Sequence, residues 1–360
     1  MKTPWELLKE SKTKIKTTWR IAFVSALVLG LLIHLPVMLS DIPNHDGLSS
    51  MYFDQNMITS GRWFLTVACG FSSYFTIPWV IGLIGLIWLG LTTAVLTEVL
   101  ELTDPVTITV VSGLLVSFPA LASTFAYVFT MDGYMLALFL AVLAVLFTAK
   151  YPRGYLTGAV CLAFSMGIYQ AYLPFTILLC VYKILLFFME EKGWEKKAKY
   201  VCRYLGMGIA GGVLYYVILQ ILLKLQGRVL DTYQGINSME QMGSGMGILT
   251  TLKGMYVDFL AFTVHGNVLV NNIFSLAACI ILVATVVFLV IRSMIWRKWW
   301  KNPAFFVIMI LLGISMPLLT NVILLISPNL TYHLLMRYQW VLYLILMTAF
   351  ADRYTAEESR

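Results

Sequence analysis

Long apolar runs separated by short polar segments dominate the chain. Most runs approach or exceed the ~20 residues of a membrane span and lack the alternation that marks a strand, so each predicts a helix that crosses a bilayer. Pro174, in the stretch YQAYLPF, predicts a tight turn or a broken helix. We expect ten spans, at about 19–39, 77–100, 106–121, 135–149, 155–168, a sixth ending near 189, 204–223, 273–295, 305–326 and 340–350.

The composition changes this picture from a helical protein to a membrane protein. Hydrophobic residues make up 60% of the chain and charged residues 12%, whereas a soluble domain has roughly 45–50% and about 25%. So little charge cannot cover a globular surface. We therefore predict an all-α, polytopic integral membrane protein.

The distribution of the net charge of +7 predicts the topology. Lys and Arg gather at both termini and around residues 150, 192–203 and 292–301, and an excess of them marks cytoplasmic loops. We expect a cytoplasmic basic segment (1–18), a membrane domain (19–350) with outer loops at 40–76, 122–134, 224–272 and 327–339, and a cytoplasmic tail (351–360). Membrane lipids are expected partners, and nucleic acid is not, because the cations lie in separate short loops.

Cysteine and histidine do not indicate a site by their spacing. The five cysteines form no CxxC pair, and four lie in apolar runs as expected packing residues. His34 lies near the outer end of the first span and is interpreted as a packed histidine. No metal signature is present. We predict no metal site and no certain cofactor, but a divalent cation on Asp41 or Asp46 remains open.

The expected outer loops hold the polar residues that could build a catalytic site. Asp41 and Asp46 lie in the first loop, and Asp132 lies in the second. A positioned carboxylate can act as a general base toward a hydroxyl, and Arg or Lys can hold a phosphate. The outer basic residues are Arg62, Lys224, Arg228, Lys253 and Arg337, with His45, His265 and His333.

Several of these residues also have a purely structural explanation. Asp46 can cap a helix, and Arg62 with Trp63 suits an anchor at the headgroup level. Tyr169 and Gln170 suit packing at a helix end. On the residues alone, both interpretations stay open.

Five stretches occur in a characteristic order along the chain. They are Asp46-Gly47, Gly61-Arg62-Trp63, FPALASTFAYVFTMDGYMLAL at 118–138, IYQAYLPF at 168–175 and MRYQW at 336–340. In this order they resemble the bacterial Gtr type II glucosyltransferase family. The resemblance implies a class C glycosyltransferase fold in the bacterial cytoplasmic membrane, with both termini inside and the active site facing outside. It also implies a polyprenyl-phosphate sugar donor, typically glucose, and a surface polysaccharide or teichoic-acid-like acceptor.

The resemblance further implies residue roles. The base is an acidic residue of the first outer loop, Asp41 or Asp46, and the Asp-Gly pair favours Asp46. Asp132 matches the acidic position of the second loop and would position acceptor or donor. Arg62 and Arg337 would contact the lipid phosphate. The predicted set is Asp46, Asp41 and Asp132 as catalytic residues, and Arg62, Trp63, Tyr169, Gln170, Lys224, Arg228, His333 and Arg337 as substrate-binding residues.

We therefore predict a membrane glycosyltransferase that moves a hexosyl group onto an extracytoplasmic glycan. The alternative is a multi-span transporter or lipid-linked sugar flippase, which would need a cavity that opens alternately to both sides. A non-catalytic membrane subunit, in which the outer polar residues bind a partner, is the third hypothesis.

Overall fold

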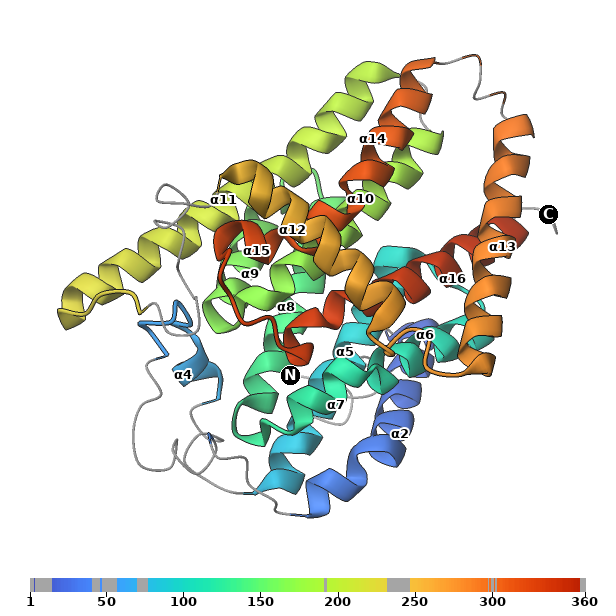
Figure 1. Cartoon of the computed structure of the whole chain (residues 1–360). Coiled ribbons are helices and arrows are strands. Elements are labelled where there is room, and N and C mark those ends of the chain that lie inside the picture. Colours follow the sequence, from blue (N-terminus) through green and yellow to red (C-terminus); the bar gives the residue numbers. More distant parts are fainter. Residues whose placement is uncertain are drawn as a thin grey trace.

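The computed structural model describes residues 15–40, 57–69, 77–190, 193–231, 247–296 and 303–356, with residues 3, 46, 298 and 301. Within these residues the protein is helical and has no strand, which confirms the all-α prediction (Figure 1). The α-helices are α2 (Thr17–Leu39), α4 (Leu65–Ala68), α5 (Pro78–Leu100), α6 (Pro105–Ser117), α7 (Pro119–Phe125), α8 (Val128–Lys150), α9 (Gly154–Ile168), α10 (Leu173–Glu190), α11 (Trp194–Gln226), α12 (Ile248–Leu260), α13 (Ile273–Trp296), α14 (Pro303–Thr320), α15 (Val322–Ile326) and α16 (Val341–Ala356). Three short elements, η2 (Gln170–Tyr172), η5 (Ala261–His265) and η7 (Leu334–Trp340), adjoin them.

Seven of the described helices are long and apolar enough to cross a membrane. An eighth span results if α6 and α7, which meet at a 49° bend, are counted together. Two shorter apolar helices, Gly154–Ile168 and Phe306–Thr320, complete the set. These helices confirm a multi-span membrane protein, while the count of ten stays a prediction.

Prolines explain where several of these helices begin and break. Pro105 and Pro119 each occupy the first turn of a helix, where a missing N–H costs nothing. Asp104 caps α6, because its side chain accepts a 2.7 Å hydrogen bond from the Thr107 amide. Phe118 has an extended backbone (φ −65°, ψ 133°) because it precedes Pro119. This extended residue produces the bend between α6 and α7. The break predicted near Pro174 is present, since α9 ends at Ile168 and α10 begins at Leu173.

The expected loop at 122–134 is instead mostly helical. Helix α7 continues to Phe125, and α8 begins at Val128, two turns before the predicted fourth span. The polar region expected at 224–272 contains α12 and the π-helical turn η5, and the tail expected from 351 continues α16 to Ala356. Hydropathy identifies the segments that are apolar enough to lie in a bilayer. A helix can nevertheless continue into polar sequence where neighbouring helices bury its polar side chains or bond to them.

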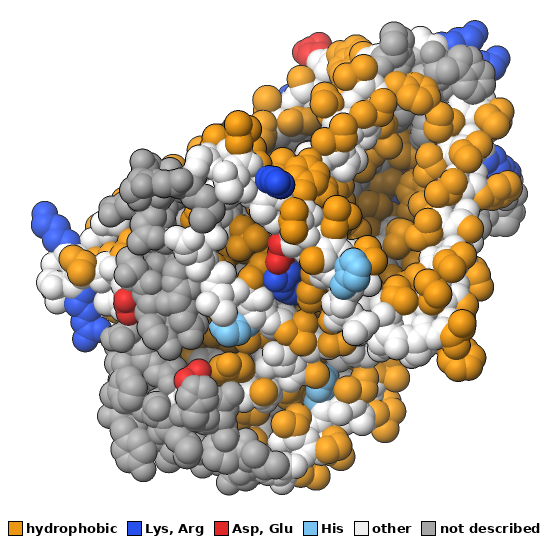
Figure 2. Space-filling view, viewed as in Figure 1, with side chains coloured by type: hydrophobic (Ala, Val, Ile, Leu, Met, Phe, Trp, Pro, Cys, Tyr) orange, Lys and Arg blue, Asp and Glu red, His pale blue; other side chains and the backbone are white. Residues whose placement is uncertain are grey.

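Helices α2, α5, α8, α9 and α11 pack against one another in that order, and α6 covers α2. Small residues allow the close approach of α2 to α5. A Cβ at Gly82 would lie 2.6 Å from Met38 Cγ, and one at Gly90 would lie 2.7 Å from Phe23. Helices α10, α14 and α16 pack near α13, which keeps most of its length exposed. Hydrophobic side chains dominate the surface over this second group (Figure 2).

Ion pairs join several helix termini at one end of the bundle, which we call the ion-pair end. Glu98 bridges two lysines, one before α2 and one at the end of α8. Glu101 bridges Lys183 of α10 and Arg353 of α16, and Arg353 also contacts Glu190. The two lysines on Glu98 are Lys16 and Lys150, at 2.7 and 3.0 Å. The segments expected on the cytoplasmic side therefore share one end.

The packing interpretation of His34 is confirmed, and that of the cysteines holds in part. His34 Nε2 lies 2.8 Å from the Val116 carbonyl oxygen, and its ring stacks on Phe125 at 4.0 Å. All five cysteines are free, as expected. Cys161 and Cys180 are buried, but Cys202 is exposed on α11, so that residue does not pack inside the protein.

Candidate functional site

A tight turn before α4 carries the Gly61-Arg62-Trp63 motif at the end of the bundle opposite the ion pairs. Gly61 has φ +81°, a conformation that glycine adopts without strain. Its backbone is clamped by two side chains. Gln170 Nε2 donates to the Ser60 carbonyl at 3.1 Å, and the Tyr215 hydroxyl donates to the Gly61 carbonyl at 3.0 Å. A Cβ on Gly61 would lie 2.5 Å from Gln170 Nε2 and 2.6 Å from Tyr215 Oη, so the motif requires glycine here.

This turn directs Arg62 toward helix α8. Arg62 Nε donates to Ser60 Oγ at 2.8 Å, and Nη1 donates to the Tyr134 hydroxyl at 3.1 Å. A guanidinium has five N–H donors, so three remain beyond these two bonds. Among the described residues, no carboxylate pairs with Arg62. A largely buried positive charge without a counter-charge is costly, and the geometry therefore suits an anionic ligand.

Tyrosine rings extend from Arg62 across the bundle, and we call Tyr134, Tyr169, Tyr172 and Tyr338 the tyrosine cluster. Tyr134 stacks on Tyr169, with ring centroids 4.2 Å apart. Tyr172 meets Tyr169 edge-on at 5.3 Å, and Tyr338 meets Tyr172 edge-on at 6.3 Å. The break between α9 and α10 places Tyr169 here in an extended conformation. Burial raises the pKa of Tyr169 well above its ordinary value, so this phenol stays a neutral hydrogen-bonding group.

Of the three predicted carboxylates, Asp132 lies within a described helix, α8. Asp132 lies on α8 two residues before Tyr134, is 5% exposed, and its Oδ1 lies 2.9 Å from the Gly133 amide nitrogen. Asp132 and Lys150 are 18 residues apart on α8, which is about 27 Å at ~1.5 Å per residue and close to the thickness of a bilayer core. Asp46 is half-buried, and Asp41 lies outside the described residues.

Arg337, the second expected phosphate contact, is fully paired. Its Nη1 and Nη2 donate to the two carboxylate oxygens of Asp258, both at 2.7 Å. Asn321 Nδ2 donates to the same carboxylate at 3.1 Å. Arg337 is 8% exposed, and the pair fastens α12 to the segment before α16. This guanidinium therefore already holds a bidentate anion, in contrast to Arg62.

Aromatic rings enclose the Arg337 guanidinium on its remaining sides. Its central carbon lies 4.0 Å from the ring of Tyr332, 4.6 Å from Phe262 and 5.5 Å from Trp340. Burial raises the pKa of Tyr332. Arg62 contacts Tyr134 of the tyrosine cluster, and Arg337 directly precedes Tyr338 of the same cluster.

The other predicted residues lie in different settings. Trp63 is buried, meets Phe164 edge-on at 5.3 Å, and covers Gly167, so it anchors the turn. Lys224 and Arg228, near the end of α11, and His333, before η7, are exposed. The structure therefore brings together Arg62, Tyr169 and Gln170 through Tyr134 and the turn, and Arg337 directly precedes Tyr338 of the tyrosine cluster. Asp132 lies on the same helix as Tyr134.

Three contributors were not selected from the sequence. Tyr134 lies inside the quoted stretch TMDGY, where its spacing from Asp132 was the available signal. Tyr215 lies within an apolar helix, and no pattern distinguishes it from its neighbour Tyr216. Asp258 lies in the region expected as the outer loop 224–272, and its pairing across 79 positions has no local signal. Among the described residues, no three potential metal ligands gather.

Helices of membrane-spanning length, with a half-buried arginine at one end that no described carboxylate neutralises, define a multi-span membrane protein with a site suited to an anionic ligand. The family model described as glucosyl transferase GtrII matches residues 35–350, and the chain belongs to this family. The protein is accordingly a membrane glycosyltransferase. The comparisons with curated proteins and with solved structures gave no match.

Proposed function

We propose that the protein transfers a glucosyl group from a polyprenyl-phosphate sugar to an extracytoplasmic surface glycan. The observation that carries this proposal is Arg62, a largely buried guanidinium whose described neighbours include no carboxylate. A sugar phosphate supplies the missing negative charge. Arg62 would hold the phosphate, and its remaining N–H donors would stabilise the charge that develops as the sugar leaves.

The reaction divides among the acidic and basic residues. The acceptor hydroxyl attacks the anomeric carbon, and the bond between that carbon and the phosphate oxygen breaks. The hydroxyl proton passes to a carboxylate base, for which Asp46 is our first choice and Asp41 the second. Asp132, which is buried on α8, would position acceptor or donor, the role that the family resemblance implies. The lipid phosphate leaves with the bond electrons.

The end of the bundle that carries Arg62 faces the outside in this proposal. Support comes from the ion-pair end, which gathers the basic segments expected in the cytoplasm. Lys224, Arg228 and His333 are exposed in the segments expected as outer loops, where they would attract the anionic headgroup of the donor. Trp63 and Gln170 would support Arg62 rather than touch the sugar, since both hold its turn.

The test uses isolated membranes supplied with polyprenyl-phosphate glucose and acceptor glycan. Asp46→Asn should abolish transfer while its abundance in the membrane stays at the wild-type level, and Glu195→Gln, at an exposed position on α11, is the matched control for an acid-to-amide change. Near-normal transfer by Asp46→Asn would remove Asp46 from the mechanism. Failure of the wild type to transfer glucose from this donor would refute the proposed donor.

Transport is the competing function, and the same preparation separates the two. A flippase would move intact lipid-phosphate glucose across sealed vesicles without forming a glycosidic bond. Product analysis of the vesicles distinguishes translocated donor from glucosylated acceptor. Translocation without product would favour the transporter.

A further inference from the structure

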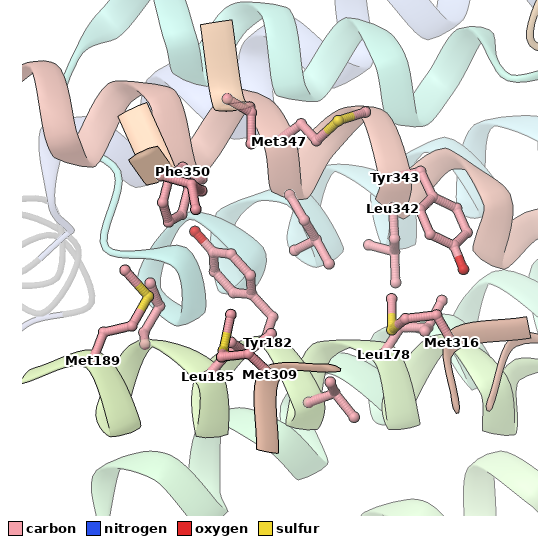
Figure 3. Close-up of a pocket in the computed structure, with 15 residues that line it drawn as sticks. Leu178, Tyr182, Leu185, Met189, Met309, Met316, Leu342, Tyr343, Met347 and Phe350 are labelled. Atoms are coloured by element: carbon pink, nitrogen blue, oxygen red, sulfur yellow. The ribbon is translucent and has the colours of Figure 1, made fainter. Parts of the chain in front are cut away.

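An apolar cavity of about 230 Å³ lies between α10, α13, α14 and α16. All 15 of its lining residues are aliphatic, aromatic or methionine. Side chains of α10, such as Leu178 and Leu185, face those of α16, such as Leu342, across the space (Figure 3). Four methionines contribute to the walls, and their unbranched thioethers adapt to an irregular chain.

The cavity has the length and the lateral access that a lipid chain needs. It extends from Leu178 to Met189 along α10, which is about 16 Å at ~1.5 Å per residue. Helix α13 forms one wall through Val286 and Val290, and most of its other side chains are exposed. The space-filling view shows a hollow lined by hydrophobic side chains in this part of the surface (Figure 2).

One end of the cavity continues into the polar groups around the candidate site. Tyr343 lines the cavity, and its hydroxyl lies 2.5 Å from Thr320 Oγ1. Gln339 Nε2 donates to the Thr320 carbonyl at 3.0 Å and to the Tyr332 hydroxyl at 2.6 Å. Gln339 directly follows Tyr338 in η7, and so the connection reaches the tyrosine cluster beside Arg62.

The two ends of the cavity differ in the charged groups near them. Near Met189 and Phe350, the ion-pair end contains two cations, Lys183 and Arg353, that pair with two carboxylates. Both of these cations are therefore already neutralised. At the tyrosine cluster, Arg62 is uncompensated among the described residues, and so a lipid with one negative head fits with its head at that end.

We propose that this cavity binds the isoprenoid chain of the lipid-phosphate donor, with the phosphate directed toward the tyrosine cluster and Arg62. The inference rests on the proposed function and adds to it the place where the chain is bound. A single branched hydrocarbon chain enters sideways from the bilayer between α13 and α14 and packs between α10 and α16. The cavity thereby selects donors by chain length.

The experiment compares two donors with full-length protein in bilayer nanodiscs. One donor is long-chain polyprenyl-phosphate glucose, and the other is geranyl-phosphate glucose, whose chain is too short to fill the cavity. Val290→Trp and Met309→Trp fill the cavity from α13 and α14. The matched controls are Ile291→Trp and Ile310→Trp, because these neighbours are 50% and 57% exposed and point away.

The expected result is a change in KM for one donor only. Each cavity variant should raise KM for the long-chain donor about tenfold, the effect of excluding roughly two methylene groups from burial. KM for geranyl-phosphate glucose, and both KM values of the controls, should stay within twofold of wild type. Equal changes for both donors, or no change for either, would overturn the inference.

A second measurement does not depend on transfer. Photoreactive polyprenyl phosphate without sugar should label residues of α10, α13 or α16 that line the cavity, and Val290→Trp should reduce this labelling at least fivefold. Labelling elsewhere, or labelling that ordinary phospholipid displaces equally well, would refute the inference. If wild type transfers from neither donor, the proposed function fails, and the labelling still decides whether the cavity binds the chain.

Discussion

The contrast between half-buried Arg62 and buried Arg337 leads to different predictions for the same substitution. Arg62→Met removes a positive charge that has no carboxylate partner among the described residues. Arg337→Met removes a positive charge that neutralises Asp258 through two 2.7 Å hydrogen bonds. Methionine keeps the length of the side chain in both cases. The substitutions therefore differ chiefly in what they leave behind.

The expected changes in the free energy of unfolding depend on whether each substitution leaves a charge without a partner. Arg337→Met leaves the Asp258 carboxylate without its cation, which costs roughly 3–5 kcal/mol at a buried site. We expect the lower end, about 3 kcal/mol, because the Asp258 side chain is 27% exposed. Arg62→Met loses hydrogen bonds to Ser60 and Tyr134 but relieves an uncompensated charge of comparable cost, so stability should be unchanged or higher.

Thermal unfolding of the two variants in the same detergent measures this difference. The unfolding temperature of Arg337→Met should fall by several degrees, and that of Arg62→Met should equal or exceed wild type. Addition of Asp258→Asn to Arg337→Met should recover part of the loss, since no bare carboxylate remains. Transfer activity should show the reverse order, with KM for the donor raised about tenfold or more in Arg62→Met, because a charged hydrogen bond is lost. An Arg62→Met protein that melts well below wild type would refute the argument that this charge is uncompensated.

Two further changes test the turn and the ion-pair end. Gly61→Ala should lower transfer at least tenfold at normal abundance, because its Cβ would lie 2.5 Å from Gln170 Nε2 and 2.6 Å from Tyr215 Oη at φ +81°; wild-type transfer rates in isolated membranes would contradict this. At the ion-pair end, burial alone would raise the pKa of the Glu101 carboxyl. Hydrogen bonds and positive charge from Lys183 and Arg353 outweigh burial, so the pKa of Glu101 is lowered. A depressed folded pKa stabilises the protein above the unfolded pKa of about 4.3, and this contribution disappears as the pH falls through the lowered value. Melting curves from pH 7 to pH 3 should therefore show a smaller acid loss for Glu101→Gln than for wild type, and parallel curves would count against the coupling.

The helical fold was predictable because a bilayer imposes one requirement on every span. A segment that crosses hydrocarbon must satisfy its own backbone, so long apolar runs indicate helices wherever they occur. The break at Pro174 was predictable for a similar local reason. The start of α8 was not, because Asp132 suggested a loop, whereas its carboxylate is buried and bonded to the next amide. Burial of one polar group depends on neighbouring helices, which no local pattern records.

The difference between Arg62 and Arg337 shows where sequence reasoning ends. Both arginines precede an aromatic residue, and both were expected to contact the lipid phosphate. Only the fold brings Asp258 to Arg337 across 79 positions. The local sequence of the two arginines is thus alike, and the role of each depends on whether a carboxylate reaches it in the fold.

Helix α10 links the two parts of the proposed donor site. Gln170, in η2 directly before α10, clamps the turn that carries Arg62. Leu178 and Leu185, further along α10, line the apolar cavity. The same helix is fastened through Lys183 to Glu101 and, at its last residue, Glu190, to Arg353. A shift of α10 along its axis would therefore move Gln170 and the cavity wall together, which in the proposed site couples the phosphate contact to the chain site.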